Sequence, residues 1–164
     1  MKVISAISAI AVLALSATAS AQTAAAPASA PAQQDTAVLA VINRMFEGFA
    51  KKDTTIIRST LHEDVKLVTA VTNREGKAVV QTTTMDKFLQ GIASAPGKLD
   101  ERLFNPEVRV DGNLATVWVL YEFWYDDKYS HCGFDSFQLA RTEMGWKIFS
   151  IADTRRKTCG PTSK

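Results

Sequence analysis

Residues 114–154 constrain the fold of this chain more than any other stretch. They read LATVWVLYEFWYDD, KYSHCGFDSFQLART and GWKIFSIADT, three successive segments rich in β-branched and aromatic residues. The pairs Asp126-Asp127 and Glu143-Met144 separate the segments, and two-residue loops commonly join antiparallel strands. The pattern predicts two consecutive β-hairpins in one sheet, whose side chains alternate between its two faces.

The segments before this region carry helical patterns. Asp35 can cap a first helix in DTAVLAVINRMFEGFAKKD, where apolar residues recur at helical spacing. A short second helix is expected over residues 54–61. Thr84 can cap a third helix over residues 85–93, which Pro96-Gly97 ends.

Further strands are expected between and after these helices. Residues 65–72 and 78–83 predict a hairpin, and residues 102–110 predict a strand interrupted by Pro106. The turn signal Asp111-Gly112 leads from that strand into the region described first. The order of helices and strands predicts an α+β domain with helices on one face of a curved antiparallel sheet.

Several local sequences carry a family resemblance. The first helix ends in EGFAKKD, and LHEDVKL, MDKFLQGI and GWKIFSIAD follow. In order and size, the chain resembles the nuclear transport factor 2-like superfamily over about residues 36–155, in particular its SnoaL-like and lumazine-binding branch. The resemblance implies a cone-shaped fold, with three N-terminal helices packed on a curved antiparallel sheet around a pocket. It implies no single chemistry, because this fold hosts enzymes, binders and assembly domains.

The N-terminus has the pattern of a secretory signal peptide. Lys2 precedes an apolar run over residues 3–15, and Ala19-Ser20-Ala21 matches a small-x-small cleavage site. We therefore expect a signal peptide over residues 1–21, with a retained membrane anchor as the alternative. Export places the mature protein in the periplasm or outside the cell, with no stable membrane insertion after processing.

The mature chain is expected to form one domain. Residues 22–34 are rich in Ala and Pro and predict a flexible leader. Residues 35–159 then form the domain, and residues 160–164 form a tail. Cleavage removes Lys2 and lowers the formal net charge from +2 to +1, so no basic surface for nucleic acid is predicted.

The chain contains two cysteines, Cys132 and Cys159, both in the exported part. An oxidising compartment favours a disulfide between them, with two free thiols as the alternative. Their spacing does not match a structural zinc site.

The face that each strand residue occupies depends on pairing register. With simple two-residue loops, Glu122 lies opposite His131 and Trp118 opposite Asp135. The second loop then places Asp135 opposite Ala152. Residues predicted to share the inner face are Trp118, Leu120, Glu122, Trp124, His131, Asp135, Phe137, Leu139, Trp146, Ile148 and Ser150. The other face is also apolar, so we expect a second subunit to cover it and form a homodimer.

Glu122, His131 and Asp135 are the candidate catalytic residues. A carboxylate beside an imidazole in an apolar pocket can transfer a proton near neutral pH. Related folds carry out isomerisation and dehydration in this way, and ketosteroid isomerase, which shares this architecture, uses carboxyl groups whose pKa values are shifted by their surroundings. The alternatives are a structural hydrogen-bonded pair and ligand anchoring without turnover.

Trp118, Trp124, Phe137 and Ser150 are the candidate ligand-binding residues. Their aromatic rings could stack a flat molecule, although aromatic rings on a buried sheet face are commonly plain core. No metal site is predicted, since His62 and His131 show no ligand spacing, and no cofactor is predicted.

Together these patterns predict an exported domain that binds a small hydrophobic or aromatic molecule. The first alternative is an isomerase or dehydratase that uses His131 with Glu122 or Asp135. The second alternative is a structural domain whose aromatic faces serve assembly.

Overall fold

The computed structural model describes residues 31–159. The helices are α1 (Pro31–Lys51), α2 (Thr54–Thr60) and α3 (Met85–Ser94). The strands are β1 (Leu61–Thr72), β2 (Ala78–Thr83), β3 (Leu99–Asp111), β4 (Leu114–Tyr125), β5 (Lys128–Thr142) and β6 (Gly145–Thr154). The signal peptide predicted over residues 1–21 and the tail predicted over residues 160–164 lie outside the described residues.

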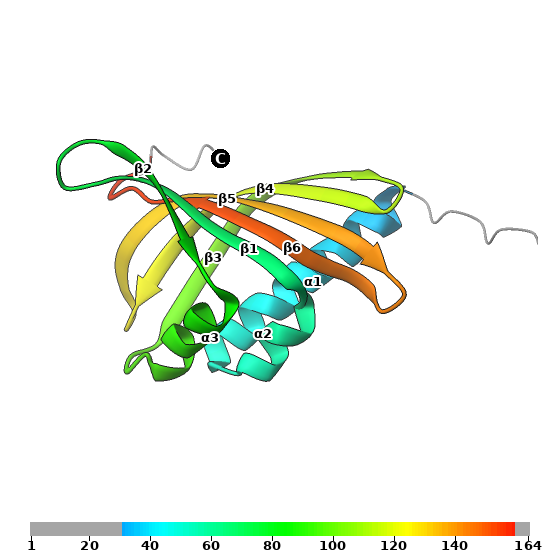
Figure 1. The fold of residues 1–164 in the computed structure, drawn as a ribbon, viewed down its shortest axis with the longest axis horizontal. Coiled ribbons are helices and arrows are strands. Elements are labelled where there is room, and N and C mark those ends of the chain that lie inside the picture. Colours follow the sequence, from blue (N-terminus) through cyan, green and yellow to red (C-terminus); the bar gives the residue numbers. More distant parts are fainter. Residues whose placement is uncertain (1–30, 160–164) are drawn as a thin grey trace, which may run out of the picture.

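The six strands form one sheet in the order β2-β1-β6-β5-β4-β3. Figure 1 shows this sheet curving over the three helices, which all lie on its concave side. The predicted α+β class is confirmed, but the sheet is not purely antiparallel, since β1 pairs with β6 in parallel. α3 follows the β1–β2 hairpin, as residues 65–93 predicted, so the description of three N-terminal helices fits only roughly. The parallel pair joins segments far apart in the sequence, and local patterns give no signal for such a pairing.

The helices begin where local chemistry supports them. α1 begins at Pro31, before the expected cap at Asp35, so residues 31–34 are helical rather than part of the leader. Proline suits the first turn of a helix because it lacks the N–H that would be unpaired there. The predicted cap of α3 is confirmed, since the Thr84 hydroxyl accepts a hydrogen bond from the Lys87 backbone N–H at 3.3 Å.

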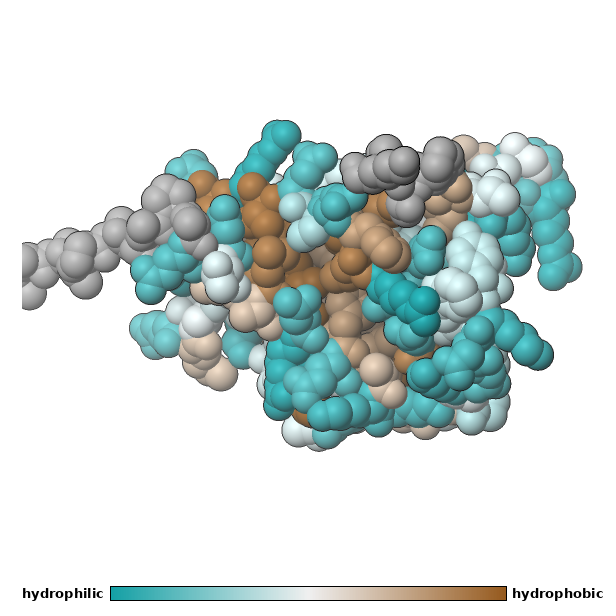
Figure 2. All heavy atoms as spheres, turned by 180° about the vertical axis from the view of Figure 1, so that it is seen from behind, coloured by the Kyte–Doolittle hydropathy of each residue, from teal (hydrophilic) through white to brown (hydrophobic). Residues whose placement is uncertain are grey.

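The core lies between the helices and the concave face of the sheet. Its fully buried side chains come from α1, α2 and the three central strands: Val38, Ile42, Ile57, Val117, Val119, Phe137, Leu139 and Ile148. From behind, hydrophobic residues gather in the middle of the molecule and hydrophilic residues surround them (Figure 2). Burial of this apolar surface is the main source of stability for such a domain.

A β-bulge after the first hairpin loop changes the predicted register. Asp126 and Asp127 form the expected two-residue loop, with φ angles of 49° and 59° that suit a tight hairpin turn. However, Trp124 pairs with Tyr129 and Phe123 pairs with His131, which leaves Ser130 as an extra residue in β5. The predicted pairing of Glu122 with His131 is therefore wrong: Glu122 pairs with Cys132.

A second bulge follows the loop at Glu143-Met144. Leu139 pairs with Ile148 as predicted, but Gln138 pairs with Ser150, which leaves Phe149 as the extra residue in β6. The expected partner of Asp135, Ala152, is therefore replaced by Asp153. This shift places the carboxyl groups of Asp135 and Asp153 on the same face of the sheet.

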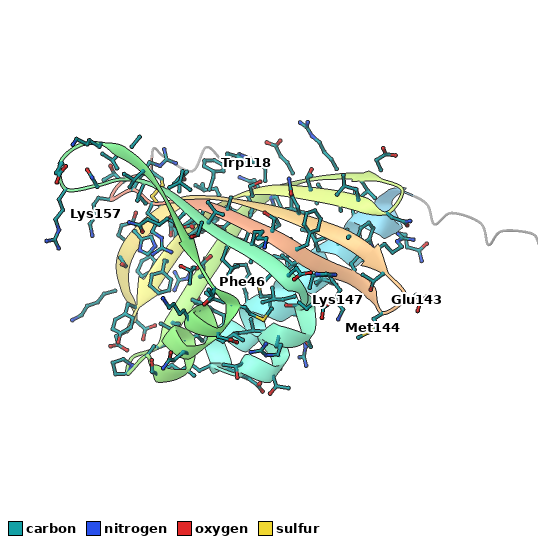
Figure 3. All side chains as sticks on the ribbon, in the orientation of Figure 1. Phe46, Trp118, Glu143, Met144, Lys147 and Lys157 are labelled. Atoms are coloured by element: carbon teal, nitrogen blue, oxygen red, sulfur yellow. A yellow bond between two sulfur atoms is a disulfide. The ribbon has the colours of Figure 1, made fainter. Side chains whose placement is uncertain are left out.

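Because of the two bulges, the residues that were predicted to share the inner face lie on both faces of the sheet. Asp135, Phe137, Leu139 and Ile148 lie on the concave face, whereas Trp118, Glu122, Trp124 and Ser150 lie on the convex face. Figure 3 shows Trp118 above the sheet and Phe46 below it, between sheet and helices. The Trp118 side chain is 47% exposed.

Candidate functional site

A cavity of about 120 Å³ lies between α1, α3 and the concave face of the sheet. One part of its wall is apolar and the other is charged. The lining residues are Met45, Phe46, Phe49, Leu67, Val68, Thr69, Thr83, Phe88, Glu101, Asp135, Phe137, Ile151, Asp153 and Arg155. A concave, partly open space with an apolar wall and a few polar groups is typical of small-molecule sites.

Aromatic rings from three elements form much of the apolar wall. Phe46 and Phe49 of α1 meet edge to face, with ring centroids 6.1 Å apart. Phe46 makes the same kind of contact with Phe137 of β5, also at 6.1 Å. Phe88 of α3 also lines the cavity. Because a helix repeats every 3.6 residues, Phe46 and Phe49 both point from α1 toward the sheet.

The charged wall is assembled from strands at both sides of β5. Glu101 comes from β3, Asp135 from β5, Asp153 from β6, and Arg155 from the residue directly after β6. Both oxygens of Asp153 accept a hydrogen bond, Oδ1 from the Thr69 hydroxyl at 2.5 Å and Oδ2 from Arg155 Nε at 2.8 Å.

Asp135 is the buried carboxyl group of this cluster. Its side chain is 3% exposed, and Oδ2 receives no hydrogen bond from any N–H or O–H group of the described residues. Burial, and then the charge of Asp153, raise the pKa of Asp135 to about 7. Buried carboxyl oxygens without a hydrogen-bond donor are uncommon, and carboxyl groups with strongly shifted pKa values concentrate at functional sites.

Glu101 completes a carboxyl pair with Asp135. Burial, the charge of Asp135 and a hydrogen bond to Asp135 raise the pKa of Glu101 well above its ordinary value. Two carboxyl groups in contact away from water resist a second negative charge, so the pair retains a proton near neutral pH. The arrangement can therefore donate or accept a proton beside the cavity.

The candidate catalytic residues do not form one cluster. Asp135 lines the cavity, but His131 is not among its lining residues. The His131 ring packs against the rings of Tyr121 and Phe123, at centroid distances of 5.8 and 5.0 Å, and burial lowers its pKa. Glu122 lies on the convex face, where its carboxyl group accepts a hydrogen bond from Trp124 Nε1 at 3.2 Å.

The candidate ligand-binding residues are also divided. Phe137 lines the cavity as expected. Trp118 and Trp124 lie on the convex face, where Trp118 stacks on Phe134 at 5.0 Å. Ser150 shares that face with Gln138 and is not among the cavity-lining residues.

The sequence interpretation missed Glu101, Asp153 and Arg155. The strand that contains Glu101 was expected to begin only at Arg102. The bulge in β6 was not foreseen, so Asp153 was assigned to the wrong face of the sheet. One signal was available. The apolar positions Trp146 and Ile148 are spaced by two residues, but Ile151 follows three residues later, and such a break in alternation indicates a bulge.

The predicted disulfide between Cys132 and Cys159 is confirmed, with Cα atoms 6.0 Å apart. It holds the segment after β6 against β5. Cys132 and Arg156 exchange backbone hydrogen bonds of 3.0 and 2.8 Å. This clamp fixes the chain on the C-terminal side of Arg155.

Gly133 permits this close approach. A Cβ atom at this position would lie 1.8 Å from the carbonyl oxygen of Thr154. The Tyr121 hydroxyl donates to the same oxygen at 2.8 Å. The backbone that carries Asp153 and Arg155 is therefore held from both sides.

Within residues 31–159, no group of three or more His, Cys, Asp or Glu side chains is arranged to hold a metal ion. Nor does any helix in this part of the chain have both the length and the apolar character needed to cross a membrane.

Comparisons with known proteins agree on the fold. The family model described as "Putative lumazine-binding" matches residues 33–152. A search of curated proteins found no match. Among solved structures, an NTF2-like protein of unknown function from Shewanella baltica OS155 has 15% sequence identity and a TM-score of 0.61, over 80% of this chain and 100% of that chain.

Two further structures have similar scores. An NTF2-like protein from Cytophaga hutchinsonii has 15% identity and a TM-score of 0.62, over 76% of this chain and 98% of that chain. A protein from Streptomyces avermitilis, described as "a putative dehydratase from the NTF2-like family", has 15% identity and a TM-score of 0.59, over 79% of this chain and 100% of that chain. At such low identity these structures establish a common fold and nothing about shared chemistry.

Proposed function

Because this chain belongs to the family described as "Putative lumazine-binding", within the nuclear transport factor 2-like superfamily, we propose that its cavity binds a small organic molecule with a flat or apolar body. The apolar part of the ligand lies among Phe46, Phe49 and Phe137. Its polar atoms meet the carboxyl groups at the other end of the cavity.

One observation carries this proposal. Asp135 is buried beside the cavity, and its Oδ2 atom has no donor among the described residues. Burying an unpaired acceptor costs about 1–3 kcal/mol, and more for a charged group. A ligand that donates a hydrogen bond to Asp135 removes this cost, and the free energy gained favours binding.

The test is a binding survey of the purified, oxidised protein. We expect some members of a panel of small aromatic and heteroaromatic molecules to raise the melting temperature, and Asp135→Asn to reduce that shift. Glu122→Gln is the matched control, because Glu122 lies on the convex face and should leave ligand-dependent shifts unchanged. A panel without any binder, measured by calorimetry as well as by thermal shift, would reject the proposal.

The carboxyl pair favours one second candidate, an isomerase or dehydratase. The sequence suggested His131 with Glu122 or Asp135, whereas the raised pKa values of Asp135 and Glu101 support these two groups as the proton carriers. The Streptomyces avermitilis protein described as a dehydratase adds only an analogy. Turnover that is abolished by Asp135→Asn but retained by His131→Ala would support the pair, and the reverse pattern would support His131.

We also propose that the protein is exported to the periplasm or the cell exterior. The Cys132–Cys159 disulfide supports this location, because such bonds persist in oxidising compartments. Mass spectrometry of the mature protein should find an N-terminus near Gln22.

A further inference from the structure

We propose that the cavity selects small organic cations, in which one protonated amine or amidine is attached to a single ring. The nitrogen binds the carboxyl group of Asp135, and the ring lies among Phe46, Phe49 and Phe137. This inference rests on the proposed binding function and names its ligand class.

The size of the cavity limits the ligand to about one ring. A dry, engineered cavity of about 150 Å³ in another protein accommodates benzene. The cavity here measures about 120 Å³, and the four aromatic rings that line it come from α1, α3 and β5. A monocyclic body fills this space, whereas a larger molecule needs part of its body outside.

The charges of the cluster leave one negative charge without a partner. Asp153 and Arg155 form an ion pair, with Arg155 Nε 2.8 Å from Asp153 Oδ2, and their charges cancel. Glu101 and Asp135 together retain one proton near neutral pH, because burial opposes a second charge. The polar end of the cavity therefore carries at most one negative charge near neutral pH, and a single cation complements and stabilises the ionised form.

The available hydrogen-bonding atoms favour a donor over an acceptor. Both oxygens of Asp153 already receive hydrogen bonds, from Thr69 and Arg155. Asp135 Oδ2 receives none from the donors of the described residues. A carboxylate oxygen accepts two hydrogen bonds, so Asp135 can bind a ligand N–H even when Glu101 donates its proton to the same carboxyl group.

The aromatic wall also suits a cation. Phe46, Phe49, Phe88 and Phe137 all line the space next to the carboxyl groups. A cation within about 6 Å of an aromatic face is attracted to the negative face of the ring. An anion meets the opposite conditions: the charge of Arg155 is balanced by Asp153, and an ionised carboxyl group in the same cluster repels an anion.

Three molecules of nearly equal shape test the inference: benzylamine, benzyl alcohol and benzoate. Binding to the oxidised protein at pH 7 is measured by calorimetry and by chemical shifts of the backbone amides. We expect benzylamine to bind about tenfold or more tightly than benzyl alcohol, as for a hydrogen bond to a charged group, and benzoate not to bind. Asp135→Asn should remove the preference for benzylamine, and Glu122→Gln should retain it.

A measurement on the unmodified protein keeps the test valid if Asp135→Asn fails to fold. Intermolecular nuclear Overhauser effects should connect the benzylamine methylene group with the β protons of Asp135 and its ring with Phe46 or Phe137. Benzylamine bound without these contacts would overturn the inference.

Different results would contradict the cation inference and the proposed binding function. If benzyl alcohol or benzoate binds in the cavity as tightly as benzylamine, the cation inference is wrong and the binding function stands. If neither these three molecules nor any member of the wider panel binds, the binding function itself is wrong.

Discussion

At the scale of single residues, the unusual feature is the pairing of Asp135 with Asp153. Like charges on directly opposite residues of neighbouring strands destabilise a sheet. Asp153 keeps its place through Thr69 and Arg155, whereas the carboxyl group of Asp135 shares a proton with Glu101. The site therefore holds carboxyl groups whose protonation depends on folding.

This dependence predicts that stability falls as the pH rises through the neutral range. The pKa values of Asp135 and Glu101 are raised in the folded state, so between about pH 4 and 7 the folded chain binds more protons than the unfolded chain. The stabilisation is fully present below about pH 4, and roughly 2–4 kcal/mol is lost as the pH rises through the folded pKa. Asp153, Arg155 and Tyr121 also interact with Asp135 or Glu101, and all three residues are unchanged in the variants compared below.

Urea denaturation between pH 4 and pH 8 measures this slope. Asp135→Asn should flatten it, and Glu122→Gln should leave it unchanged. An identical slope for Asp135→Asn and the unmodified protein would show that this carboxyl group does not titrate as described.

At the scale of elements, close packing of the chain beyond β6 against β5 depends on Gly133. We expect Gly133→Ala to lower the free energy of unfolding by about 1–3 kcal/mol or more, because its Cβ would overlap the carbonyl oxygen of Thr154. Gly91→Ala is the matched control. It lies in α3 with no atom within 4 Å of the added Cβ, so it should be neutral or stabilise by up to about 1 kcal/mol.

Chemical denaturation of both variants checks this expectation. Ligand binding by Gly133→Ala should weaken as well, because Asp153 and Arg155 lie on the displaced backbone. Equal stability of the two variants would argue against a tight approach at Thr154.

The helices and strands were largely predictable from the sequence, whereas the face of the sheet on which each residue lies was not. Hydrophobic periodicity and turn residues correctly indicated α3, the β1–β2 hairpin and both two-residue loops, because these depend on neighbours in the sequence. Each bulge inserts one residue and exchanges the faces beyond it. The missed residue in β5 separated Glu122 from His131, and the missed residue in β6 brought Asp153 opposite Asp135. The parallel pairing of β1 with β6 and the inclusion of Glu101 depend on long-range packing that no local pattern encodes.

At the scale of the whole molecule, the convex face of the sheet presents an exposed tryptophan, Trp118, beside the half-buried Phe134. Trp118 is 47% exposed and stacks on Phe134. Large exposed aromatic groups on an open sheet commonly mark contact surfaces. The homodimer expected from the sequence is therefore proposed to use this face.

We expect Trp118→Lys to shift a dimer to monomers in sedimentation equilibrium by at least tenfold in dissociation constant, as for truncation of an interface anchor. Met144→Lys is the control, because Met144 is 80% exposed at the tip of the β5–β6 hairpin, away from Trp118 (Figure 3). A monomeric unmodified protein at high concentration would remove the proposed dimer, and equal effects of both variants would place the contact elsewhere.

The disulfide closes a loop with a sequence separation of 27 residues. A cross-link of this length is expected to stabilise the fold by about 3–4 kcal/mol in the chain-entropy model. The Cys132→Ser, Cys159→Ser double variant should lose this amount in denaturation experiments, whereas reductant should have no effect on that variant. A loss well below 1 kcal/mol would show that the backbone contacts of Cys132 with Arg156 suffice.

The same bond makes the geometry of the binding site depend on the oxidation state of the two cysteines. Arg155 lies between the last strand and the cross-linked segment, so we expect oxidation of the two thiols to restrict its motion. In the reduced chain, the aromatic wall should persist and the counter-charge of Asp153 should be less firmly held. Under the proposed export, ligand affinity would therefore change when the chain reaches an oxidising compartment.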